Sequence, residues 1–368
     1  CVYVKLSNFK LKGSDITVPF SLTMLNFTET QLFKSKISIL TIPRENFWIF
    51  KSGVLEIIYH IIDSYETRSK STQSDNDNYS SSDNETDNDN ESKEEESGME
   101  IEDDGLFFHL AFTREEVTIF CSSKLIKRHF SKAIELDKES TVIGDEFFII
   151  QVLNDGSNIG KKILELTQPL SLNNISLFFI SNYFSDLVLV PIKDKTKALE
   201  ILENPYEPSI NEEAEIKTFE LFKKNNIQPK IVLDSKLLLT GARSGDYVEV
   251  LKQTAEAISR LNVMKDFPRI FAITRTPTEE IGLLLPCEEK ELNNLRYRKS
   301  TIMGSLQDYY YAIVVDLKML PLDLKGVVSG IATKLLRLQV NEMSYLSLGK
   351  SGLVLVPDLF LDIVERGL

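Results

Sequence analysis

The chain has 368 residues, 42% of them hydrophobic and 26% charged, and a formal net charge of −13. This length allows two to four small domains, and the composition is that of a folded protein. No window approaches the run of about eighteen apolar residues that a membrane-spanning helix needs. Cys1, Cys121 and Cys287 are too few and too scattered for a disulfide framework, a zinc knuckle or another metal site, so we expect reduced thiols and a cytoplasmic protein. Because the chain begins with Cys1, we expect part of the N-terminus to be missing.

The charge is concentrated in one segment, residues 66–104, which holds fifteen acidic and three basic residues and so carries −12 of the −13. The rest of the chain is nearly neutral, which disfavours nucleic-acid binding. The segment is poor in apolar residues, and we predict that it is a disordered acidic insert. Its spacing of aspartates lacks the glycine of a calcium-binding EF-hand loop. Five hydroxyl residues have an acid three positions later and are candidate phosphorylation sites, although a solvated spacer remains the alternative: Ser74, Ser80, Ser82, Thr86 and Ser92.

The first part of the chain begins with an N-terminal extension of unclear fold, residues 1–35. A helix is expected at Val54–Tyr65, where the side chains are apolar on nearly every side. The strand-like segments around it are Lys36–Pro43, Asn46–Phe50, Leu106–Ala111 and Val117–Cys121. The acidic insert therefore interrupts a unit at a surface loop, where insertions cost little stability.

The next segments predict a strand at Phe147–Leu153, a helix at Gly160–Leu172, two strands and a closing helix up to Glu203. This order of strand, helix, strand and strand is the split βαβ arrangement of ferredoxin-like folds. The order recurs twice after residue 229, and both the second and the last unit contain the string LVLVP, with Pro191 and Pro357 lying 166 residues apart. We therefore predict an α+β protein of about four ferredoxin-like (βαββ) units in two tandem pairs.

Catalytic motifs are absent from the sequence, and we expect neither an enzyme nor a cofactor. His60 and His109 lie in apolar segments, where a structural role is the usual one, and no nucleophile–base or carboxylate-pair pattern occurs. The glycine-rich loops at residues 154–162, 240–246 and 347–352 lack the spacing of a phosphate-binding loop. Two of them precede a helix, and a helix N-terminus favours a carboxylate such as that of a free amino acid.

The segment from Phe147 to Val190 resembles the second ACT domain of the cytosolic arginine-sensor (CASTOR) family. The resemblance is carried by a helix ending in TQPLSLNN and the strands ISLFFISNY and SDLVLV, with Pro169, Ser181 and Asp186 at matching places. Weaker similarity extends from Lys36 to Leu368 outside the insert. It implies four ACT-like domains: residues 36–142, interrupted by the insert, 143–205, 229–304 and 305–368, with a linker at 206–228.

The resemblance also implies a function. Family members bind a free amino acid between their second and fourth domains and regulate the TOR kinase pathway through a partner protein complex, without enzymatic activity. Similar ACT modules form the regulatory half of aspartokinases, and this chain shows no kinase half. No membrane insertion is implied, and a homodimer is compatible with the exposed edges of ACT sheets.

Carried over residue by residue, the family's amino-acid site comprises Ser176 and Leu177 on the second domain, Asp323, Leu324, Lys325, Gly326 and Val327 in the loop of the fourth, and Gly352 before the last strand. At Gly352 the family has an aspartate that pairs with the arginine side chain. This chain lacks that partner, and Lys325 places a cation in the loop. Two functions follow: an amino-acid-responsive regulator, or a ligand-free scaffold of the same fold that acts through protein contacts.

Overall fold

The computed structural model describes residues 30–74, 106–153, 159–204, 207, 210, 212–321 and 324–368. The order strand, helix, strand, strand, helix occurs four times along the chain, and we refer to the four segments as the first to fourth units. The first unit consists of β1 (Thr30–Pro43), α1 (Phe47–Ser74), β2 (Phe108–Phe112), β3 (Glu116–Ser122) and α2 (Ser123–Leu136). The second consists of β5 (Phe147–Leu153), α3 (Ile159–Leu172), β6 (Phe178–Ser181), β7 (Ser185–Pro191) and α4 (Lys195–Glu203).

The second half of the chain repeats the pattern. The third unit consists of β8 (Lys230–Ala242), α6 (Tyr247–Arg260), β9 (Phe271–Arg275), β10 (Ile281–Pro286) and α7 (Glu289–Leu295). The fourth consists of β12 (Tyr310–Asp316), α8 (Val327–Arg337), β13 (Ser344–Ser347), β14 (Ser351–Pro357) and α9 (Leu361–Gly367). Elements outside the pattern are β4 (Thr141–Val142), α5 (Glu212–Lys224) and β11 (Ile302–Met303).

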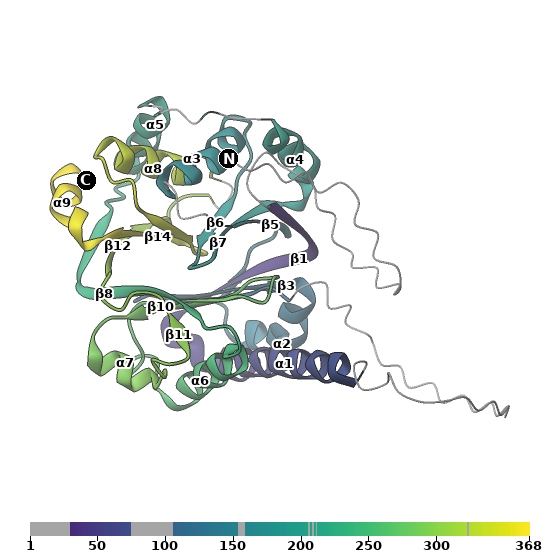
Figure 1. The fold of residues 1–368 in the computed structure, drawn as a ribbon. Coiled ribbons are helices and arrows are strands. Elements are labelled where there is room, and N and C mark those ends of the chain that lie inside the picture. Colours follow the sequence, from purple (N-terminus) through teal and green to yellow (C-terminus); the bar gives the residue numbers. More distant parts are fainter. Residues whose placement is uncertain are drawn as a thin grey trace, which may run out of the picture.

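Twelve of the strands form one closed sheet in the order β10-β9-β2-β3-β1-β5-β7-β6-β13-β14-β12-β8, and β8 pairs with β10 to complete the circuit. The sheet folds into two facing layers, with helices on both outer sides (Figure 1). The first and third units build one layer with α1, α2, α6 and α7 outside; the second and fourth build the other with α3, α4, α5, α8 and α9 outside. The units that share a layer are therefore not neighbours in the sequence.

The long strands β1 and β8 connect the two layers. β1 pairs with β5 through Thr30–Ile37 and with β3 through Ile37–Pro43, with an irregularity between Phe33 and Ile37. β8 likewise pairs with β12 along its first half and with β10 along its second. Because both layers end in these shared strands, the described part of the chain presents no open sheet edge to which a second molecule could add a strand. The exposed edges with which a homodimer would be compatible are therefore absent from the twelve-stranded circuit of the described residues.

Apolar side chains form cores on both faces of the layers, as the alternation along strands requires. One core lies between the first layer and its helices, with Phe50, Phe112 and Phe271 fully buried. A second lies between the other layer and its helices, including Phe179 and Val354. Between the layers lie two further clusters, one built mainly of phenylalanine and isoleucine and one mainly of leucine and alanine. No helix of the described residues is long and apolar enough to span a membrane.

Several expected boundaries were wrong. Residues 46–50, expected as a strand, lie in a short 3₁₀ turn and the first turn of α1, because Phe47 and Phe50 pack on one helical face against the sheet. β1 begins at Thr30, inside the expected extension. α1 continues to Ser74, beyond the expected start of the insert at residue 66, and α5 lies in the expected linker. Most of the insert, with Ser80, Ser82, Thr86 and Ser92, lies outside the described residues.

Candidate ligand-binding site between the second and fourth units

The second and fourth units meet at a short junction between β6 and β13 that has local two-fold symmetry. The strands share one paired position, Ile180 with Leu346, which are 166 residues apart like the two prolines. On one side of this pair the backbone N–H of Phe179 donates to Oγ of Ser347 at 2.8 Å. On the other side the N–H of Tyr345 donates to Oγ of Ser181 at 3.2 Å. The offset of 166 therefore relates equivalent positions of the two units.

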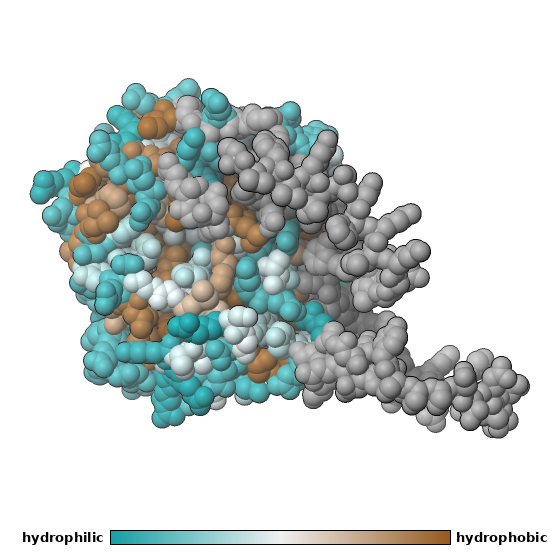
Figure 2. Space-filling model, in the orientation of Figure 1, coloured by the Kyte–Doolittle hydropathy of each residue, from teal (hydrophilic) through white to brown (hydrophobic). Residues whose placement is uncertain are grey.

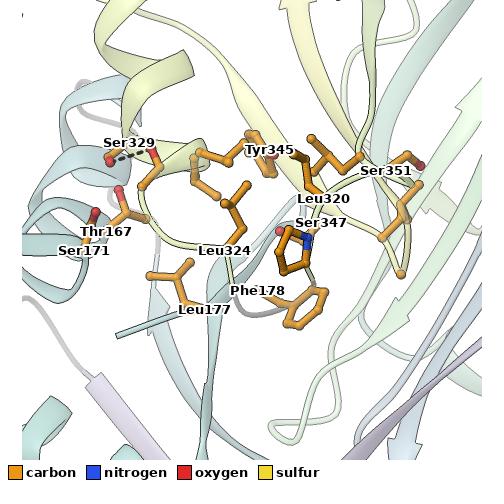
Figure 3. Close-up of a pocket in the computed structure, with 17 residues that line it drawn as sticks. Thr167, Ser171, Leu177, Phe178, Leu320, Leu324, Ser329, Tyr345, Ser347 and Ser351 are labelled. Atoms are coloured by element: carbon orange, nitrogen blue, oxygen red, sulfur yellow. Dashed lines mark hydrogen bonds between the residues drawn. The ribbon is translucent and has the colours of Figure 1, made fainter. Parts of the chain in front are cut away.

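Because the ladder is so short, side chains and loops rather than strand pairing occupy the space on each side of the axis. At the N-terminus of α8 this space encloses a cavity of about 70 Å³ (Figure 3). A water molecule needs roughly 10–15 Å³ by the same measure, so the cavity has room for several non-hydrogen atoms. The residues that line it are Thr167, Ser171, Leu177, Phe178, Leu317, Leu320, Pro321, Leu324, Gly326, Val327, Val328, Ser329, Tyr345, Ser347, Leu348, Gly349 and Ser351.

One wall of the cavity is the N-terminus of α8. Gly326 is the cap residue, with φ of +85°, and no side chain caps the helix by hydrogen bonding. The first helical bond runs from Gly330 N–H to the Gly326 carbonyl at 2.8 Å, so the N–H groups of the first turn, Val327 to Ser329, have no acceptor within the helix. All three of these residues line the cavity. Free N–H groups and the positive end of the helix dipole favour a carboxylate.

The remaining walls combine hydroxyl and apolar side chains. In Figure 3 the hydroxyls of Thr167 and Ser171 lie on the α3 side and those of Ser347 and Ser351 on the sheet side, with Leu324 between them. No Asp, Glu, Lys, Arg or His occurs among the described lining residues. Burial raises the pKa of Tyr345, the remaining ionisable group, so its hydroxyl stays neutral. The described part of the wall therefore combines hydroxyl and apolar groups and holds no ionised side chain.

The loop between β12 and α8 supplies much of the lining because it is longer than its counterpart. By sheet register, Asp316 on β12 is equivalent to Leu153 on β5, since their partners Ser351 and Ser185 are 166 residues apart. Nine residues separate Asp316 from Gly326, whereas six separate Leu153 from the equivalent Gly160. The three extra residues allow the fourth unit's loop to wrap around the cavity.

Two turns of the cavity wall also contact the first unit. Ser351 hydrogen-bonds to Glu116 at the start of β3, and the N–H of Gly349 donates to Oγ1 of Thr118 at 3.2 Å. Lys318, in the β12–α8 loop, forms an ion pair with Glu115. Burial raises the pKa of Glu116, against the opposing effect of the Ser351 hydrogen bond. The β2–β3 turn and the start of β3 therefore contact both loops that frame the cavity.

Outside the cavity, α5 covers the approach to it. A groove of about 410 Å³ between α3, α5 and the β12–α8 loop shares Ser171 and Gly326 with the cavity lining. Thr218 of α5 donates to the Gly326 carbonyl at 3.3 Å. Glu215 of α5 pairs with Arg337 of α8 at 2.9 Å and with Lys334 at 3.4 Å. This helix, which the sequence analysis assigned to a linker, therefore lies at the entrance.

The structure places some of the predicted site residues in the lining of the cavity and others away from it. Leu177, Leu324, Gly326 and Val327 line the cavity. Asp323 lies outside the described residues, as does the preceding Leu322.

Three predicted residues lie away from the lining. Ser176 is adjacent to Leu177, and neighbouring residues that lead into a strand face different sides. Lys325 is exposed and lines the outer groove, where its ammonium stays hydrated. Gly352 lies behind Tyr345, whose hydroxyl stands 2.5 Å from where a Cβ on Gly352 would be.

The hydroxyl groups of the wall and Tyr345 were not predicted from the sequence. The usable signal was the repeat itself, since Tyr345 and Gly352 take the places of Phe179 and Asp186 at the offset of 166. No group of three or more His, Cys, Asp or Glu that could hold a metal occurs in the part of the chain that the structure describes.

Residues 142–204 match the ACT domain family, a span that runs from β4 to the end of α4 and contains the second unit. The chain therefore contains an ACT domain. Such domains are regulatory, amino-acid-binding modules. No curated protein matches the sequence significantly. Among solved structures, the chain is similar to an aspartate kinase from Synechocystis, with 10% identity and a TM-score of 0.29. The similarity covers 91% of this chain and 54% of the aspartate kinase chain.

Proposed function

We propose that the protein is a non-enzymatic regulator that binds a free amino acid in the cavity between the second and fourth units. The observation that carries the proposal is the N-terminus of α8, which no side chain caps and which forms one wall of the cavity. Leu177 and Ser171, from the segment that matches the ACT domain family, line the same cavity. The N–H groups of Val327 to Ser329 receive the ligand's carboxylate, and the hydroxyls opposite receive its amino group. All four units are, on this proposal, ACT domains.

Signalling follows from the position of the cavity. Ligand fixes the β12–α8 loop and the β13–β14 turn, and both contact the β2–β3 turn of the first unit. Occupancy of one layer therefore biases the conformation of the other, which changes the affinity for a protein partner. We propose that this partner belongs to a nutrient-signalling complex, with the TOR pathway as the candidate, and that the protein acts in the cytoplasm.

Thermal unfolding against each of the twenty amino acids tests the binding. A ligand at about 100 times its dissociation constant stabilises the fold by about 2.7 kcal/mol, which raises Tm by several degrees. We expect Leu177→Trp, which fills the cavity, to abolish the shift. Leu136→Trp is the matched control, because Leu136 is 76% exposed on the opposite layer. The absence of any shift in the wild-type protein would contradict the proposal.

A ligand-free scaffold is the second candidate, and exposed apolar side chains favour it. Trp48 and Met264 are 74% and 57% exposed and line the same groove of about 250 Å³ at the start of α1. On the face seen in Figure 2, hydrophobic and hydrophilic side chains are interspersed among the described residues. If no amino acid binds and Trp48→Ala abolishes capture of a partner, while Leu136→Ala does not, the scaffold function is supported.

A further inference from the structure

We infer that the exposed face of α2 binds an acidic segment of the same chain, residues 94–104. This interaction is independent of the amino-acid cavity and of the proposed function. Its evidence is the charge of α2, a comparison of α2 with the equivalent helices of the other units, and the place where the chain returns from the acidic insert to the fold.

The exposed face of α2 is basic. The helix buries Leu125, Ile126 and Phe130 in the core of the first layer, and its one carboxylate is Glu135 near its end. Like charges three or four positions apart on a helix repel each other, so a counter-charge beside this face would stabilise it. Four exposed cations occupy the face at this spacing: Lys124, Lys127, Arg128 and Lys132.

The described acids around α2 are paired with other residues. Glu56 of α1 lies 2.7 Å from Nδ1 of His129. Glu146 pairs with Lys36 at 3.1 Å. Across the described ranges, no carboxylate forms an ion pair with any of the four cations of α2. Their counter-charge therefore comes from residues outside the described part of the chain or from salt.

Comparison of the units shows that the basic helix belongs to the unit that carries the insert. The helices that close the other three units are α4, α7 and α9. α4 holds two lysines and two glutamates, and α7 and α9 each hold two acids and one base, whereas α2 holds four cations and one acid. Because the four helices are equivalent in the repeat, packing alone does not require the cations of α2. Their excess coincides with the unit that an acidic segment interrupts.

The chain returns from the insert beside the N-terminus of α2. Phe108, at the start of β2, pairs with Cys121 of β3, and α2 begins two residues after Cys121. The buried Arg275 donates to the carbonyl of Leu106, which fixes the point of return. Residues 94–104 (EEESGMEIEDD) lie just before this point, outside the described residues, and contain seven acids and no base.

The lengths of the segment and the helix are compatible with contact along the whole face. Eleven extended residues span up to about 36–40 Å, whereas the 14 residues of α2 span about 21 Å. A segment attached so close to its binding face has an effective concentration in the millimolar range, so pairs that are individually weak are sufficient for binding. The acidic segment therefore supplies the counter-charge of α2.

Carbodiimide cross-linking of the full chain with peptide mapping tests the interaction, because this reagent joins a carboxylate to an amine in direct contact with it. At about 50 mM salt we expect links from residues 94–104 to the three lysines of α2, with a yield at least about fivefold lower at about 500 mM salt. Lys223 and Lys224 of α5, also exposed, are the internal control on the other layer. Equal linking to these two lysines, or links formed between labelled and unlabelled copies alone, would overturn the inference.

A variant of the helix face measures the effect on the segment. At low salt we expect a glutamate-specific protease to cleave residues 94–104 at least about threefold faster in the variant than in the wild type, because a bound segment is a poorer substrate. Lys223→Gln with Lys224→Gln is the matched control and should leave the rate unchanged. The variant combines four substitutions in the full chain: Lys124→Gln, Lys127→Gln, Arg128→Gln and Lys132→Gln.

A folded helix variant whose segment is cleaved at the wild-type rate would overturn the inference. If that variant does not fold, substitutions in the segment decide instead: Glu94→Gln, Glu95→Gln and Glu96→Gln. Removing three of its seven acids should lower the cross-link yield of the other four at least about twofold, and an unchanged yield would also overturn the inference.

Discussion

The two sides of the Ile180–Leu346 pair, which we call the open cleft at α8 and the closed cleft at α3, are built from equivalent residues, yet they differ in what fills them. At the α8 end, Gly326, Leu177 and a long loop surround a cavity. At the α3 end, the N–H of the equivalent Gly160 donates to the Asn341 carbonyl at 3.0 Å, and Met343, which replaces Leu177, packs against it. A backbone carbonyl thus accepts from a first-turn N–H of α3, whereas no side chain caps the N-terminus of α8. Duplication of a unit thus supplies both walls of one cleft while the second cleft serves stability.

The largest expected effect comes from emptying the closed cleft. Met343 is 2% exposed in the core of the second layer, so Met343→Ala should lower the free energy of unfolding by about 2–5 kcal/mol. Leu177 is half-buried and faces a cavity that already exists, so we expect Leu177→Ala to cost less than half as much and to weaken the amino-acid response instead. Urea unfolding of both variants, with and without ligand, measures the two effects. Equal costs at the two positions would contradict the assignment of one open and one closed cleft.

A second difference between the clefts is the charge of Asp186, which should appear as a pH dependence of stability. Burial raises the pKa of Asp186 to about 6, against smaller opposing effects of Ser181 and Lys162. The folded state therefore binds this proton more tightly than the unfolded state, and stability falls as the pH rises from about 4 to about 6. The loss amounts to about 3 kcal/mol above that window, by the usual conversion of a pKa shift to free energy.

Asp186→Asn removes this titration and keeps the shape of the side chain. We expect the variant to be more stable than the wild type at pH 7.5 and not at pH 4, as measured by denaturant midpoints at both values. Glu116, Glu280 and Glu291, whose pKa values are also raised by burial, titrate in both proteins, so the difference between the two curves isolates Asp186. If the stability curves of the wild type and the variant stay parallel over the whole pH range, the pKa of Asp186 is not raised by burial. That result would show that its carboxylate has a partner.

The sequence predicted the repeated unit well and the closure of the sheet poorly. The strand Phe147–Leu153 begins and ends where the apolar pattern placed it, and the helix predicted at Gly160–Leu172 begins one residue earlier, at Ile159, because each has a regular apolar pattern. The pairing of the first unit with the third could not be predicted, because it depends on how far β1 and β8 continue past an irregularity that local pattern does not reveal.

At the cavity, the family resemblance pointed to the β12–α8 loop, but the hydroxyl side chains and Tyr345 of the wall were not predicted. Gly326 was placed in this loop by the family resemblance, and in the structure it is the cap residue of α8 with a positive φ, which glycine adopts without strain. Tyr345 was not predicted, because within its strand it has the pattern of an ordinary aromatic core residue. Its role depends on its contact with Gly352, which the fold brings beside it.

The smallest expected effect is the difference in stability cost between alanine at Gly326, at the N-terminus of α8, and alanine at Gly160, at the N-terminus of α3. At Gly326 an alanine must adopt φ of +85° and approaches Oγ of Ser171 at 3.0 Å, so Gly326→Ala should lose about 1–2 kcal/mol. It should also lose the thermal shift with amino acids, because the added methyl narrows the mouth of the cavity. Gly160 is helical, and the gain in helix propensity of up to about 1 kcal/mol offsets part of the crowding by Met343 Cε at 2.9 Å and by the Asn341 carbonyl oxygen at 3.0 Å. We therefore expect Gly160→Ala to cost less than Gly326→Ala and to keep its ligand response. A Gly160→Ala protein that loses the response, with Gly326→Ala unaffected, would place the binding site in the other cleft.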